Sequence, residues 1–433
     1  MSVVEFLHRG VAHLPDLAKF AIGMMLIISI PRLSRRVRLP EAVGLLLSGV
    51  VIGPHVLDVF PEHHPVAQFF SELGMLFLMF FAGLEIDLGL FRQQISRSIV
   101  FGVATTTIPL LLGTLATLWL GYGLLPAIVM GSLLASHTLL GSTIVTKLGV
   151  NRLEPIVVTI GATMMSDTLS LLVFAICVPL YASGFSASGL VVQVVEIVVF
   201  VPLVLFGLSR AAAYVLKRVE DEEETYFIVL LCVLAVTALL AQLINLPGIV
   251  GTFLAGLAVN AAVKDQPAKS KLEFMGRSLF IPIFFIVTGF LIDPLALARG
   301  VTSDFLLAAG IIAALVAGKW IAAESCGRIF GYAPAARRTM WSLTLPQVAA
   351  TLAAALVAFR TSNAAGQPLL DGRMLNGVLL MVLFTAVLGP VLTQRFAPRM
   401  LEASPDLPAP STGPADRSSH DADGLPVSRS RMI

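Results

Sequence analysis

A single carboxylate lies in the middle of a long apolar stretch of this sequence. Asp167 belongs to the run T-M-M-S-D-T-L-S, and no other charged residue occurs between Glu154 and Glu196. Ionisable groups inside a membrane span are costly and usually functional. Away from water, a carboxyl group holds its proton more tightly than in solution, and a bare monovalent cation can replace that proton on the same oxygens. Asp167 is therefore the first candidate for an ion carrier, the alternative being a structural aspartate that hydrogen-bonds to nearby hydroxyls.

Hydroxyl side chains supply the hard oxygen ligands that sodium or potassium would need beside Asp167. Ser166, Thr138 and Thr344 are the predicted hydroxyl ligands, and Ser136, His137 and Gln347 are also predicted to bind the ion. Cys177, Cys232 and Cys326 lie in apolar runs without metal-type spacing, so we interpret them as small buried hydrophobic residues. The sequence thus predicts a monovalent cation at Asp167, no other metal and no cofactor.

Three further ionisable residues inside apolar runs have open roles. Lys319 can neutralise Asp167, brace neighbouring helices, or extend its amine to the cytoplasmic surface. His137 can be a pH-responsive ligand or an inert hydrogen-bonding histidine. Glu196 can serve packing as easily as function, and its role stays open.

The composition places the chain in a membrane. Of its 433 residues, 57% are hydrophobic and 13% are charged, with a mean hydropathy of +0.89, whereas soluble domains carry about 25% charge. Residues 1–397 form the predicted transmembrane domain, and 398–433, rich in Pro, Ser and Asp, read as a disordered cytoplasmic tail. No nucleotide loop, catalytic nucleophile or metal cluster occurs, so neither an enzyme nor a nucleic-acid partner is expected.

Thirteen apolar segments predict an all-α polytopic membrane protein with thirteen transmembrane helices. The connections after odd-numbered segments hold 17 Lys and Arg residues, and those after even-numbered segments hold 3. Because such residues stay on the cytoplasmic side, the N-terminus is predicted outside and the C-terminus inside. The expected segments are 16–31, 41–57, 66–84, 97–120, 122–147, 153–180, 190–216, 225–245, 247–263, 275–293, 302–327, 337–358 and 374–397.

Two motifs recur at nearly one spacing. The pattern L-P-x-x-V-G-x-x-L-x-G begins at Leu39 and again at Leu246, and the pattern G-x-x-I-D begins at Gly83 and again at Gly289. The offsets are 207 and 206 residues. Equivalent positions are seven segments apart, so the second copy must cross the membrane in the opposite sense. This predicts the six-helix inverted repeats typical of secondary transporters, although Gly-rich packing faces recur in many membrane bundles.

Equivalent segments of the two repeats carry polar interruptions at their centres. The first reads A-S-H-T-L-L-G-S-T from Ala135 and includes Ser136 and His137; the second reads S-L-T-L-P-Q from Ser342 and ends at Gln347. Proline removes a backbone donor, and hydroxyl groups can bond to carbonyls that lose their helical partners. Both segments are predicted to unwind near the midplane, the alternative being a proline kink with a hydroxyl-rich packing face.

On these motifs the sequence resembles the monovalent cation:proton antiporter superfamily, in its second branch of Kef-type and bacterial sodium/proton exchangers. The residues that carry the resemblance are the motif at Leu39, F-F-x-x-x-G-x-x-I-D from Phe284, Asp167, Gly318-Lys319 and T-L-P-Q from Thr344. It implies two crossed broken helices in a core domain, a dimerisation domain and thus a homodimer, and elevator-like movement of the core. It also implies a bacterial inner-membrane location, with Asp167 as ion carrier and Lys319 as charge partner or second proton carrier.

The sequence departs from that family at three places. Ser166 stands where members often have a second acidic residue or asparagine, and Ser136-His137 stands where the first break often reads Thr-Asp. No nucleotide-binding regulatory domain is expected after Met400. The expected function is exchange of Na⁺ or K⁺ for H⁺, with proton-coupled symport or a non-transporting ion or pH sensor on the same fold as alternatives.

Overall fold

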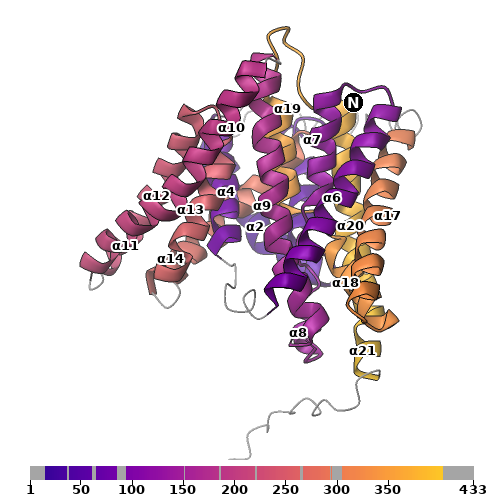
Figure 1. Ribbon diagram of the computed structural model, residues 1–433. Coiled ribbons are helices and arrows are strands. Elements are labelled where there is room, and N and C mark those ends of the chain that lie inside the picture. Colours follow the sequence, from indigo (N-terminus) through magenta and orange to yellow (C-terminus); the bar gives the residue numbers. More distant parts are fainter. Residues whose placement is uncertain are drawn as a thin grey trace, which may run out of the picture.

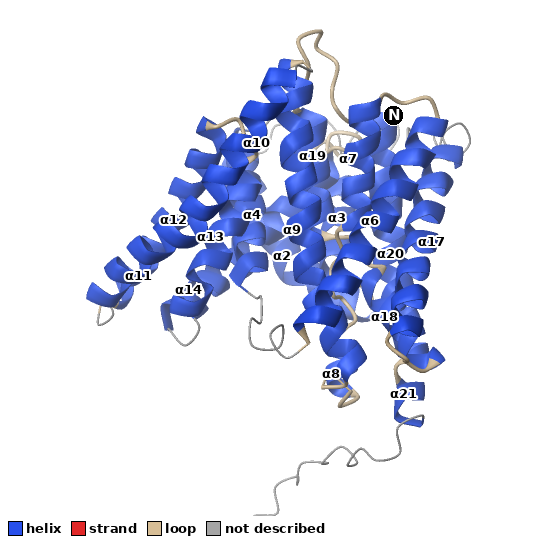
Figure 2. Cartoon of the chain, in the orientation of Figure 1, coloured by secondary structure: helices blue, strands red, loops and turns tan. Residues whose placement is uncertain are grey.

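The bundle described by this computed structural model is helical throughout (Figure 2). The structure describes residues 15–36, 39–60, 65–84, 94–150, 152–184, 187–219, 222–263, 267–292, 294 and 305–402. Within these ranges there is no β-strand, and one isolated bridge joins Ser362 to Pro368. The all-α prediction is confirmed for this part of the chain. The motif residues Asp87 and Asp293 lie outside the described residues. Of the tail predicted from 398 onward, residues 398–402 are helical, contrary to the prediction of disorder, and the rest lies outside the described residues.

The helices follow one another with short connections. The first part of the chain forms α2 (Asp16–Arg36), α3 (Glu41–Ile52), α4 (Pro65–Leu84), α6 (Ile95–Trp119), α7 (Leu124–Ala135), α8 (Ser142–Lys147) and α9 (Glu154–Ser183). A linking segment of α10 (Ala187–Pro202), the π-helix η1 (Leu203–Leu208) and α11 (Ser209–Arg218) follows. The last part forms α12 (Glu223–Leu243), α13 (Gly248–Val263), α14 (Pro267–Met275), the π-helix η2 (Gly276–Phe280), α15 (Ile281–Phe290), α17 (Phe305–Ile329), α18 (Pro334–Thr344), α19 (Ala349–Arg360), α20 (Gly372–Phe396) and α21 (Pro398–Glu402).

Each of the thirteen predicted segments contains a helix. Among the described residues, nine helices are long and apolar enough to cross a membrane, and four apolar helices of 10–17 residues accompany them. The short ones include α3 and α13, which open with the repeated L-P motif, and the halves α7 and α19. A polytopic membrane protein follows from these lengths.

Two groups of helices lie side by side (Figure 1). One group contains α6, α7, α9, α17, α18, α19 and α20; the other contains α3, α4, α12, α13 and α15. They touch where α9 and α19 lie against α4 and α13. We call the first group the core and the second the scaffold.

Glycine pairs join the scaffold helices backbone to backbone. A β-carbon at Gly49 of α3 would overlap the Ile286 carbonyl oxygen of α15, and one at Gly289 would overlap the Leu46 oxygen. The same reciprocal contact joins α4 and α13 through Gly83 and Gly256. All four glycines belong to the two repeated motifs. Small residues allow membrane helices to approach this closely, so the motifs specify these two contacts.

Candidate functional site

The two predicted interruptions are present, and they meet. The backbone is not helical over 136–141, between α7 and α8, nor over 345–348, between α18 and α19. The Thr138 N–H donates to the Pro346 carbonyl oxygen at 2.8 Å, which ties one break to the other. Each break leaves helix-end carbonyls that need donors from elsewhere, because lipid offers none.

Gln347 supplies some of these donors. Its Nε2 donates to the Leu134 carbonyl at 3.3 Å and to the Ser136 carbonyl, while its Oε1 accepts from the Thr351 hydroxyl at 2.6 Å. The side chain is fully buried. The predicted ion ligand Gln347 is therefore placed as a bridge between the two breaks.

Asp167 points from α9 at the first break. Its Oδ1 accepts from the Ser136 hydroxyl at 2.7 Å and from the His137 backbone N–H at 3.4 Å. Among the described residues, Oδ2 has no hydrogen-bond partner. The carboxylate thus keeps one oxygen available on a half-buried side chain. Such a group can hold either a proton or a cation.

A cavity of about 780 Å³ connects Asp167 to one end of the bundle. Near the site it is lined by His137, Thr138 and Thr163, and farther out by Arg32, Arg35, Glu41 and Arg277. Those basic residues belong to connections that the charge bias assigns to the cytoplasm. An ion can therefore reach Asp167 from that end.

Lys319 contacts carbonyl oxygens and His137; no ion pair with Asp167 occurs in the described part of the chain. The Nζ atom donates to Thr105 O at 3.0 Å and to Ala135 O at 2.6 Å, and the side chain is completely buried. Ala135 ends α7, so the ammonium lies at the negative end of that half-helix. These bonds link α17 to α6 and to the end of α7, and the role of Lys319 as charge partner of Asp167 or second proton carrier stays a prediction.

Proline explains why Thr105 O accepts this bond. In a regular helix, the N–H of residue 109 would donate to Thr105 O, but residue 109 is Pro109, inside α6. Gly318 lets α17 pack against the same ring, because a β-carbon there would lie 2.9 Å from the Pro109 Cα. Lys319 therefore replaces one donor lost to proline and another lost at the end of α7.

The hydrogen bonds around the His137 ring define its tautomer. Its Nε2 lies 2.9 Å from the Thr163 hydroxyl, which itself donates to Thr159 O, so Nε2 carries the proton and donates to Thr163. Its Nδ1 then accepts from the Lys319 ammonium at 3.4 Å, beside the Ser166 hydroxyl at 3.1 Å. A neutral ring fits these contacts, since a second ring proton would face the ammonium.

The other predicted ligands are distributed unequally around the site. Ser136 contacts Asp167 directly, Ser166 lies at the His137 ring, and the Thr138 side chain lines the cavity. The Thr344 hydroxyl donates to Trp341 O of its own helix at 3.0 Å, and no contact with Asp167 is seen in the described residues. Thr163 and Thr105 also belong to the site but were not predicted from the sequence. For Thr105, the sequence does contain a signal, because Pro109 lies four residues later and cannot donate to the Thr105 carbonyl oxygen.

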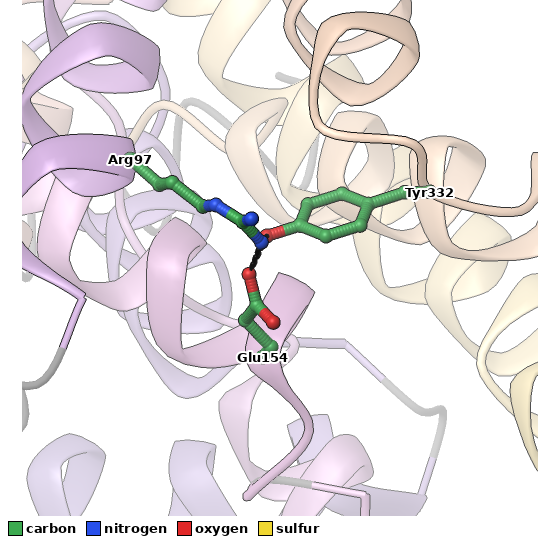
Figure 3. A network of polar contacts seen from close by, with 3 residues as sticks. All are labelled: Arg97, Glu154 and Tyr332. Atoms are coloured by element: carbon green, nitrogen blue, oxygen red, sulfur yellow. Dashed lines mark hydrogen bonds and ion pairs between the residues drawn. The ribbon is translucent and has the colours of Figure 1, made fainter.

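A polar network fixes the beginning of α9 (Figure 3). Arg97 of α6 forms an ion pair with Glu154, and the Tyr332 hydroxyl donates to the same carboxylate at 2.7 Å. Burial raises the pKa of the Tyr332 phenol, despite the lowering effect of Arg97, so the hydroxyl keeps its proton at neutral pH. The network joins α6, α9 and the turn before α18, all of which belong to the core.

Comparison with known proteins gives a consistent result. A family model described as sodium/hydrogen exchanger, transmembrane, matches residues 22–397. The Na⁺/H⁺ antiporter NhaS5 of Synechocystis is 42% identical over 384 residues, covering 89% of this chain and 55% of that protein, so this chain spans little more than half of NhaS5. The probable Na⁺/H⁺ antiporter 3 of Methanocaldococcus jannaschii is 25% identical over 343 residues, covering 78% and 87%.

Solved structures show the same fold. The sodium proton antiporter MjNhaP1 from M. jannaschii at pH 8 superimposes with a TM-score of 0.70 at 15% identity. The match covers 89% of this chain and 98% of that structure.

Proposed function

Because the family match covers most of its length, the chain belongs to the sodium/hydrogen exchanger family, and we propose that it exchanges Na⁺ or K⁺ for protons, with Asp167 binding each in turn. The observation that supports this assignment is the Asp167 carboxylate, held at the crossing of two broken helices and reached by a cavity from one end. Exchange driven by sodium, potassium and lithium across a pH series in everted vesicles tests it. A protein that changes thermal stability with the cation but produces no flux would be a sensor instead.

The proposed transport cycle moves the core relative to the scaffold. Among the described residues, the cavity that reaches Asp167 leads to the basic end, which in the proposed topology is an inward-facing state. The reciprocal glycine contacts support an inverted repeat, because exchanging the two copies of each motif interchanges the α3–α15 and α4–α13 contacts. An elevator-type displacement of the core would then open the site to the other side. As the resemblance implies, we expect the chain to act as a homodimer in the bacterial inner membrane.

The proposed topology has thirteen transmembrane helices, with the N-terminus outside and the C-terminus in the cytoplasm. The elements α8, α11, α14 and α21 lie at one end of the bundle (Figure 1). Their sequences include Lys147, Lys217, Lys269 and Arg399. This clustering supports a cytoplasmic position for that end.

Cysteine labelling in a background lacking the three native cysteines checks this topology. A cysteine at exposed Ser270 is expected to react only with reagents that reach the cytoplasm, and one at exposed Ala365 only from outside. Reversed labelling would overturn the orientation and leave the fold unaffected.

We expect exchange to be electroneutral. If Asp167 alone alternates between one proton and one monovalent cation, the loaded carrier has the same charge in both states. Lys319 donates to two backbone carbonyl oxygens, which accept these bonds whether or not a cation is bound at Asp167, so we expect it to keep its proton through the cycle. In proteoliposomes, an imposed potential of about 100 mV is worth about 2.3 kcal/mol per net charge moved, and it should leave the rate unchanged. A strong voltage response that disappears in Lys319→Gln would make Lys319 a second proton carrier.

A further inference from the structure

A second cavity, of about 620 Å³, lies on the other side of the bundle. Its lining includes Ser183 at the end of α9, Thr361 after α19 and Asn245 before α13. In the proposed topology these positions face outward. Val178, also in the lining, is eleven residues after Asp167 on α9, about 16 Å along the helix, so this outer cavity is separate from the carrier site.

Three charged side chains line the outer cavity. Arg360 of α19 lies 3.7 Å from Glu72 of α4, measured between Nη1 and Oε1, and this ion pair offsets both charges. Glu196 of α10 has no hydrogen-bond or ion-pair partner among the described residues. The lining therefore has a net charge of −1, and that charge belongs to Glu196.

Gln193 lies one turn before Glu196, on the same face of α10. It lines the outer cavity although it is only 5% exposed, and its Nε2 has no hydrogen-bond partner within the described ranges. A buried amide without partners costs about 1–3 kcal/mol. Its carbonyl oxygen Oε1 has no partner among the described residues either, but unlike Nε2 it is not fully buried, so it is open to the cavity. A ligand in the cavity can therefore contact this oxygen.

The geometry points to a binding site for a monovalent cation at Glu196 and Gln193, on the outer side of the exchange pathway. This inference rests on the proposed exchange function. One unpaired carboxylate and one amide oxygen are hard ligands with a single negative charge, which matches Na⁺ or K⁺ and disfavours anions. A carboxylate inside a low-dielectric cavity also raises the local cation concentration. The site would hold the cation before it reaches Asp167 from outside, or after it leaves.

The site predicts an effect confined to one side of the membrane. Glu196→Gln keeps the shape of the side chain and removes its charge. In right-side-out vesicles, where sodium is added at the outer face, we expect the KM for sodium to rise about five- to tenfold. In everted vesicles, where sodium is added at the cytoplasmic face, the KM should stay at the wild-type value.

Two matched variants complete the experiment. Glu222→Gln removes one carboxylate from the connection between α11 and α12, at the opposite end of the bundle, and should leave the outer KM unchanged. Glu196→Asp keeps the charge and should restore most of the outer affinity. The inference alone would be overturned if the wild-type protein exchanges ions but Glu196→Gln leaves the outer KM for sodium unchanged. A change in KM that is equal on both sides of the membrane would overturn it as well. Absence of exchange in the wild type would overturn the proposed function and the inference with it.

Discussion

Asp167→Asn is expected to reduce cation-dependent proton movement to the level of protein-free vesicles. The amide keeps the shape of the side chain and can still accept from the Ser136 hydroxyl, but it cannot exchange a proton for a cation. We expect the variant to fold, since the carboxylate takes part in no ion pair among the described residues. The measurement is sodium-driven proton flux in vesicles with equal amounts of folded protein.

Asp371→Asn provides the matched control for this substitution. Asp371 caps α20 by accepting from the Met374 N–H at 2.8 Å, far from the site along the chain, and asparagine is as good a cap. This variant should exchange normally. A folded Asp167→Asn protein with the same rate as Asp371→Asn would remove Asp167 from its proposed role.

Lys319→Met is expected to lower the stability of the folded protein by about 2–4 kcal/mol. The substitution leaves Thr105 O and Ala135 O without this donor at a position where the lysine side chain is completely buried. The substitution also removes the free-energy cost of burying the ammonium. The expected loss of stability is therefore smaller than the summed free energies of two hydrogen bonds from a charged donor. Thermal unfolding in detergent measures the change.

Lys217→Met is the control for this second prediction, because Lys217 is exposed near the end of α11. Its effect should stay within about 0.5 kcal/mol. If Lys319→Met were as stable as Lys217→Met but lost exchange, Lys319 would be a proton carrier and its carbonyl contacts would be secondary. Loss of stability with one-for-one coupling retained in the folded fraction would identify it as a brace.

The helices and their interruptions could be predicted from the sequence because the signals are local. Apolar runs specify the spans, and Pro346 and the polar run from Ala135 mark the breaks without any knowledge of packing. Asp167 stood out for the same reason, since one charge in a long apolar run needs no comparison with distant residues.

The partners of Lys319 depend on contacts between segments far apart in the chain. Its position beside Thr105 requires α17 to pack on α6 through Gly318 and Pro109, and its contact with Ala135 requires α7 to end there. Nor did the sequence show that the His137 ring would lie beside Ser166 and Lys319. These side chains converge only after the helices pack.

The glycine contacts of the scaffold restrict how the protein can deform. At Gly49 and Gly289 the two backbones already touch, and the same is true at Gly83 and Gly256. Sliding either helix pair by one residue would bring a side chain against the facing carbonyl oxygen, and packed membrane helices have no space to absorb it. These two helix pairs therefore cannot slide internally, and in the proposed cycle the displacement that moves Asp167 between the two sides would take place where α9 and α19 meet α4 and α13.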